Sequence, residues 1–107
     1  MYTSTDLSMI HDPYFTILKL TQNECELQSN NTTHCWRITP SPEGYYTLHH
    51  KHHSQDPYHY QSTSISVEDC LLEIADHDDF QLRRRKPTKT HPTDTFFNHI
   101  LEVYESI

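Results

Sequence analysis

The sequence has little glycine, little positive charge and no long apolar run. It contains one glycine, Gly44, and eight lysines and arginines against fifteen aspartates and glutamates, for a formal charge of −7. The shortage of cationic side chains argues against direct binding of nucleic acid or anionic membranes, because both depend on lysine and arginine meeting phosphate. No segment approaches the roughly 18 apolar residues of a membrane span, and the first residues lack the basic start of a signal peptide. We therefore expect a cytoplasmic protein without membrane contact.

The three cysteines are odd in number and show no Cys-x-x-Cys spacing. This pattern argues against a disulfide framework. We expect Cys25, Cys35 and Cys70 to be buried free thiols.

Short alternating segments separated by polar turns predict an antiparallel β-meander of four to five strands. The expected strands are residues 14–21, 24–28, 33–39, 45–52 and 58–63, and the first of them is rich in β-branched and aromatic residues. Trp36 and Ile38 share one face of their strand and are expected in the core. In the turn before that strand, Asn30 and Asn31 are expected to supply the positive φ that glycine usually provides.

Two helices are predicted after the strands. The first helix is expected over residues 66–77, which begin with a capping serine, Ser66. Its apolar residues have the spacing of one helix face and are Val67, Cys70, Leu71 and Ile74. Residues 77–79, His-Asp-Asp, are expected to end this helix, with residues 80–82 as a short edge strand. A C-terminal helix over residues 94–106 carries a wide apolar stripe, which could close over the sheet or form a homodimer.

At 107 residues, the chain has the usual size of one domain. Residues 1–13 are polar and end in Asp-Pro, and we expect them to form a loose N-terminal arm. Residues 14–107 are predicted to form a single α+β domain, with the antiparallel meander packed by one capped helix and the C-terminal helix added to it.

Residues 45–60 hold five of the ten histidines and four of the seven tyrosines. On a strand, residues two apart share a face, so His50 and His52 could bind one ion. We take His59 as the third ligand, with His34 or Cys35 on a neighbouring strand as alternatives. The competing interpretation is a polar, solvated hairpin, because the spacing matches no known zinc signature.

A protein-binding surface is the other candidate for function. Tyr45, Tyr58 and Tyr60 flank the same hairpin, and tyrosine supplies a large contact area with a polar tip. The helix over residues 66–77 adds an acidic face with Glu68, Glu73 and Asp76, which could imitate a phosphate backbone toward a basic partner.

The sequence therefore favours a small non-catalytic protein-binding or regulatory protein that needs no cofactor. One form of it would be an acidic inhibitor of a nucleic-acid enzyme, of the kind used by phages and mobile elements against host defence. The alternative is a zinc-binding module, or a zinc-dependent hydrolase, built on the histidines of residues 49–53.

Overall fold

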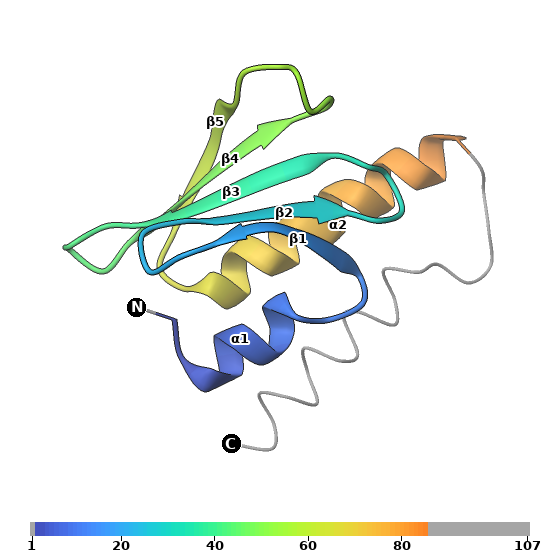
Figure 1. Cartoon of the computed structure of the whole chain (residues 1–107). Helices are drawn as coiled ribbons and strands as arrows, with labels where there is room; N and C mark the ends of the chain where they lie inside the picture. Colours follow the sequence, from blue (N-terminus) through green and yellow to red (C-terminus); the bar gives the residue numbers. More distant parts are fainter. Residues whose placement is uncertain (1, 86–107) are drawn as a thin grey trace.

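Five antiparallel strands and two helices make up residues 2–85, the part of the chain that the computed structural model describes. The strands are β1 (Phe15–Leu20), β2 (Cys25–Ser29), β3 (Cys35–Pro40), β4 (Tyr46–Lys51) and β5 (His59–Ser64), and the helices are α1 (Ser4–Ile10) and α2 (Val67–Arg85). The strands pair in chain order, so that the sheet is a meander (Figure 1). The predicted α+β class with an antiparallel sheet is confirmed.

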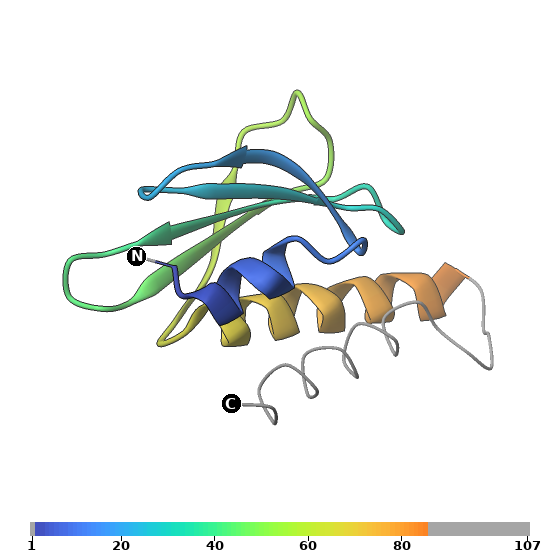
Figure 2. The ribbon, with the colours of Figure 1, turned by 60° about the horizontal axis from the view of Figure 1, so that its bottom comes forward.

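Both helices lie on the same face of the sheet, and the core fills the space between them and the strands (Figure 2). Trp36 and Ile38 point into this space, as predicted, and are fully buried together with Leu48 of β4. Ser66 caps α2 by accepting a hydrogen bond from the Asp69 amide at 3.1 Å. The predicted apolar face of the helix is buried against the sheet at Val67, Cys70, Leu71 and Ile74.

Helix α2 is longer than predicted. It runs to Arg85 and includes residues 80–82, which we expected to form a strand. The acidic residues do not end it. Asp78 is fully buried and hydrogen-bonded, and Asp79 pairs with Arg83 one turn further along at 2.7 Å. A helix that anchors one carboxylate inside the core and pairs the next on its surface can continue through both.

The N-terminal residues form helix α1, so the prediction of a loose arm was wrong. Thr3 and Asp6 make a reciprocal capping box, in which Thr3 Oγ1 accepts from the Asp6 amide at 3.0 Å and Asp6 Oδ2 accepts from the Thr3 amide at 2.9 Å. Met9 and Ile10 at the end of the helix are fully buried. The polar composition of this segment concealed a cap followed by an apolar pair that anchors the helix to the core.

In the turn before β3, the positive φ falls on Thr33, at 66°, rather than on Asn30 or Asn31 as predicted. A β-branched residue rarely adopts this conformation, because its Cβ crowds the backbone at a cost of about 1–2 kcal/mol. The Thr33 hydroxyl donates a 2.6 Å hydrogen bond to the Thr32 carbonyl oxygen. His34 follows directly, so this strained turn sets the direction of its side chain.

Cys25, Cys35 and Cys70 are buried free cysteines, as predicted. The helix predicted over residues 94–106, and the dimer contact it suggested, lie outside the described residues. Within residues 2–85, neither helix combines the length and the apolar character needed to cross a lipid bilayer.

Candidate metal centre

Five histidines from four parts of the chain gather where the inner face of the sheet meets α2. This histidine cluster consists of His34 in the turn before β3, His50 on β4, His52 just after β4, His59 on β5 and His77 on α2. Each ring centroid lies within 5.1 Å of at least one other. The fold therefore brings together imidazoles that are up to 43 residues apart in the sequence.

His50 is at the centre of the cluster and is 2 % exposed. It lies directly opposite Trp36 in the pairing of β3 with β4, and the two ring centroids are 4.2 Å apart with 33° between the planes. Trp36 Nε1 donates a 3.1 Å hydrogen bond to Ser29 Oγ, which fixes the indole. Packing against Trp36 and the register of β3 with β4 thus fix the position of the His50 imidazole.

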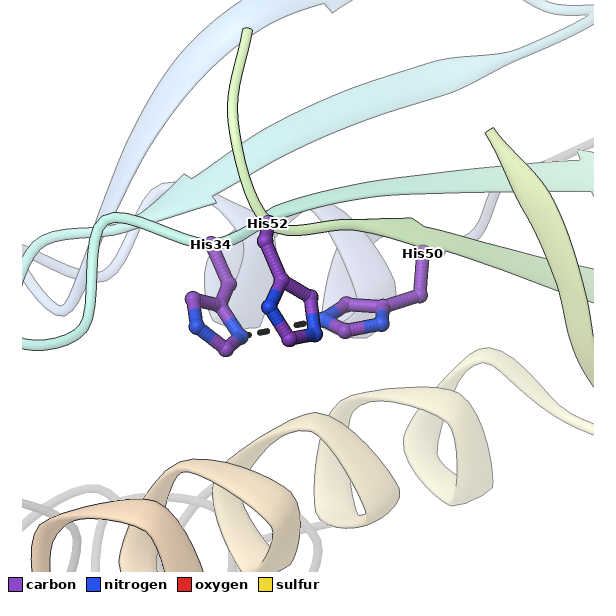
Figure 3. A group of neighbouring side chains, drawn as sticks. All are labelled: His34, His50 and His52. Atoms are coloured by element: carbon purple, nitrogen blue, oxygen red, sulfur yellow. Dashed lines mark hydrogen bonds between the residues drawn. The ribbon is translucent and has the colours of Figure 1, made fainter. Parts of the chain in front are cut away.

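His34 and His52 lie beside this central ring. His34 Nδ1 is 3.0 Å from His50 Nε2, and the exposed His52 stacks on His34 with ring centroids 4.4 Å apart and 18° between the planes. Figure 3 shows the three side chains lying next to one another on the face of the sheet that α2 covers. His52 reaches this face because it is two residues beyond His50.

The three side chains form a group that could hold a metal ion, since one ligand nitrogen of each lies within 4.8 Å of the others. In a tetrahedral zinc site with Zn–N bonds of about 2.0–2.1 Å, ligand nitrogens lie about 3.3 Å apart. The pair formed by His34 Nδ1 and His50 Nε2 is already close to this spacing at 3.0 Å. The third ligand, His52, has an exposed side chain that can adjust toward the other two.

His59, which the sequence indicated as a ligand, approaches the opposite side of His50. Its Nε2 is 3.3 Å from His50 Nδ1, the nitrogen that faces away from His34. Metal-binding histidines commonly donate their second ring N–H to such a partner, which fixes the tautomer and the ring orientation. If His50 Nδ1 carries the proton toward His59, its Nε2 presents a lone pair toward His34. The geometry therefore gives His59 the place of an orienting partner.

A second group with ligand atoms within 4.8 Å of one another consists of His34, His77 and Asp78. Asp78 is fully buried, with Oδ2 accepting from Tyr14 Oη at 2.6 Å and Oδ1 accepting from Thr32 Oγ1 at 2.8 Å. His77 Nδ1 is buried and has no hydrogen-bond partner within residues 2–85. An unsatisfied buried group of this kind costs about 1–3 kcal/mol.

The electrostatics keep the central imidazole neutral. Burial, reinforced by the four other imidazoles of the histidine cluster, lowers the pKa of His50 to about 3. Burial also lowers the pKa of His77, although the nearby Asp78 carboxylate acts in the opposite direction. The pKa of Asp78 is raised by its own burial against the effect of its hydroxyl donors. A neutral imidazole with an available lone pair is the form that binds metal ions.

The tyrosines of the predicted binding surface differ in exposure and in their position along the strands. Tyr60 is 62 % exposed and pairs with His49 in the middle of the β4–β5 ladder, whereas Tyr45, 51 % exposed, lies before the first residue of β4. Tyr58 is half-buried under two cations, with Arg37 Cζ 4.7 Å and Lys51 Nζ 4.3 Å from its ring centroid.

The acidic residues proposed for the same surface differ in exposure along α2. Asp76 is exposed and Glu68 is half-buried. Glu73 is also half-buried, and its Oε1 accepts a 2.8 Å hydrogen bond from Ser62 Oγ on β5. Glu73 therefore joins α2 to the edge strand of the sheet.

Sequence reasoning missed His77 and Asp78 because it ended the helix at this point. The apolar positions Val67, Cys70, Leu71 and Ile74 continue at helical spacing to residues 77 and 78, which places both on the buried face. Extending the periodicity by one turn would have identified them.

A scan of protein-family models, a search of curated proteins and a search of solved structures found no match to this chain.

Proposed function

We propose that this protein binds a transition-metal ion, with zinc as the best-fitting candidate, through His34, His50 and His52. The observation that carries the proposal is the convergence of three imidazoles whose ligand nitrogens lie within 4.8 Å of one another. Imidazole suits zinc, copper, nickel and iron, and a site of three nitrogens without thiolate is a common arrangement for zinc.

The burial of the site supports metal binding over a solvated histidine surface. His34 is 4 % exposed and His50 is 2 % exposed, so packing holds the two rings in place with one nitrogen of each 3.0 Å apart. Because His50 is neutral at physiological pH, an ion can take its lone pair without displacing a proton. The exposed His52 leaves one side of the group open to solvent, where a water molecule could complete the coordination.

The test is zinc titration of tag-free protein by calorimetry at pH 7.5, together with elemental analysis and thermal melts with and without chelator. We expect a bound ion whose affinity falls at least tenfold in each of His34→Gln, His50→Gln and His52→Gln. At a free zinc concentration about 100 times the Kd, the folded state should gain about 2.7 kcal/mol. The exposed His11, whose Nδ1 lies 2.8 Å from the Leu7 carbonyl oxygen of α1, gives the matched control His11→Gln.

Zinc binding that is equally strong in the wild type and in all three variants would show adventitious binding elsewhere and would refute the proposal. Assaying the same samples with an activated ester distinguishes a zinc-dependent hydrolase from a zinc-binding module. A zinc-dependent hydrolase gains activity with zinc and loses it in His50→Gln, whereas a binding module shows neither change.

We also propose, on a separate observation, that the outer tyrosines contact another protein. Tyr60 and Tyr45 expose more than half of their surface, and tyrosine supplies a large contact area with a polar tip and few rotatable bonds. The double variant Tyr45→Ala/Tyr60→Ala should lose the partner in affinity capture, and an unchanged set of captured proteins would count against this surface. Tyr58 is left intact because it packs under Arg37 and Lys51.

A further inference from the structure

We propose that His34, His77 and Asp78 form a second metal-binding site next to the first, so that the chain holds two ions with the His34 ring between them. This inference rests on the proposed function, because the second site shares His34 with the first. The ligand atoms of the three residues lie within 4.8 Å of one another. Of these residues, His34 and Asp78 are both buried.

The unsatisfied nitrogen of His77 is the first argument for an ion here. Its Nδ1 is buried and has no hydrogen-bond partner in the described part of the chain. Its ring is packed on three sides by Trp36, His34 and His50, with centroids 5.1, 5.4 and 4.7 Å away. Since the rings hold His77 in this position, a metal ion is a ligand that could satisfy the nitrogen without unpacking the core.

The Asp78 carboxylate is oriented by hydrogen bonds, as metal-binding carboxylates usually are. Hydrogen bonds from Tyr14 Oη and Thr32 Oγ1, one to each oxygen, fix the plane of the carboxylate. The Ser29 side chain is a third hydrogen-bond partner of this carboxylate. Since a carboxylate has about four lone-pair positions, one position remains for an ion. Hydroxyl groups that orient a ligand from behind are typical supports of metal sites.

The charge around the second site is suited to a cation. Burial is the largest effect on the pKa of His77 and lowers it, as does His52, whereas the carboxylates of Asp78, Glu73 and Asp76 act in the opposite direction. In the first site the groups acting on His50 are imidazoles alone. A second divalent ion would therefore bring its charge to the more acidic side of the histidine cluster, which reduces the repulsion between the two ions.

His34 can serve both ions because imidazole has two ring nitrogens. Its Nδ1 faces His50 Nε2 at 3.0 Å and belongs to the first site. The second ion would take Nε2, and the ring proton would pass to the buffer as that nitrogen–metal bond forms. Two ions on one imidazole lie about 6 Å apart, given metal–nitrogen bonds of about 2 Å.

The experiment is a zinc titration of tag-free protein at pH 7.5 with the bound ions counted by elemental analysis after gel filtration. We expect two ions per chain in the wild type and in His11→Gln. His77→Gln and Asp78→Asn should each retain one ion with an unchanged first Kd, while His52→Gln should weaken the first ion. If two Cu²⁺ ions are loaded instead, spin coupling through the shared ring should reduce the integrated electron paramagnetic resonance signal well below two spins per chain.

A wild type that binds one ion, or variants at His77 and Asp78 that still bind two, would overturn the second site. One ion that depends on His34, His50 and His52 would leave the first site standing, whereas no bound ion would refute both. Circular dichroism checks the fold of each variant. If Asp78→Asn unfolds, His77→Gln decides the question alone, because His77 is only half-buried and its Nδ1 makes no hydrogen bond within residues 2–85.

Discussion

Acidification should destabilise the metal-free protein through His50. In the unfolded chain this imidazole titrates near pH 6.5, but in the folded protein burial and the neighbouring imidazoles lower its pKa to about 3. As the pH falls below about 6.5, the unfolded chain therefore takes up a proton that the folded protein does not. Stability that is fully present above this pH is lost progressively below it.

The size of the effect follows from the linkage relation. Between pH 7.5 and pH 5.5, one histidine that stays neutral in the folded state lowers the free energy of unfolding by about 1.4 kcal/mol. This figure holds for any folded pKa below about 4.5, so it does not depend on the depth of the shift. His49 and His77, whose pKa values are also lowered by burial, act in the same direction. The raised pKa of Asp78 acts in the opposite direction, since the folded state then binds that proton more readily at low pH.

Urea unfolding of chelator-treated protein at the two pH values measures this difference. With a slope of about 1–3 kcal/mol per molar urea, the midpoint should fall by between about 0.5 and 1.4 M on acidification. His50→Gln should reduce this pH dependence by about 1.4 kcal/mol, the share worked out for one histidine, and the matched control His11→Gln should retain it. Equal midpoints at pH 7.5 and 5.5 in the wild type, or an undiminished dependence in His50→Gln, would refute the reasoning.

Three further changes test other parts of the structure. Thr33→Gly should stabilise the protein by about 0.5–1 kcal/mol, because relief of the strained positive φ outweighs the added conformational freedom of the unfolded chain. A lower urea midpoint in this variant would contradict the strained turn. Leu48→Ala should lower the free energy of unfolding by about 2–5 kcal/mol, since truncation of a fully buried side chain leaves a cavity between the sheet and α2. A loss below about 1 kcal/mol would mean that this core is loosely packed. His59→Ala should weaken zinc binding about 10- to 100-fold, whereas His59→Gln, which can still accept from His50 Nδ1, should restore much of it. If both variants bind zinc like the wild type, His59 does not orient His50.

The sheet could be predicted from sequence because each strand carries its own signal. Alternation along β3 placed Trp36 and Ile38 in the core, and proline, asparagine and glycine marked the turns between strands. The same period of two placed His50 and His52 on one face. Strand alternation and turn residues are properties of short segments, so they can be recognised from the sequence without knowing the tertiary contacts.

The rest of the candidate site depends on contacts that no local pattern contains. His34 joins His50 only because the register of β3 against β4 and the conformation of Thr33 bring it there. His77 belongs to the cluster only if α2 continues past Asp76. That depends on the burial of Asp78, which is hydrogen-bonded to Tyr14 just before β1 and to Thr32 in the β2–β3 turn. Helix α1 was missed for a different reason. Its capping box was legible in the sequence, but the burial of its last residues was not.

The contact between the indole of Trp36 and the imidazole of His50 gives the protein an internal optical reporter. Trp36 is the single tryptophan of the chain, so all indole fluorescence comes from one ring whose centroid is 4.2 Å from that of the central histidine. A proton or a paramagnetic ion such as Cu²⁺ on that imidazole would quench the emission at contact range, whereas diamagnetic Zn²⁺ would change it without such quenching. Occupancy and protonation of the centre can therefore be followed in solution with the native sequence and no attached dye.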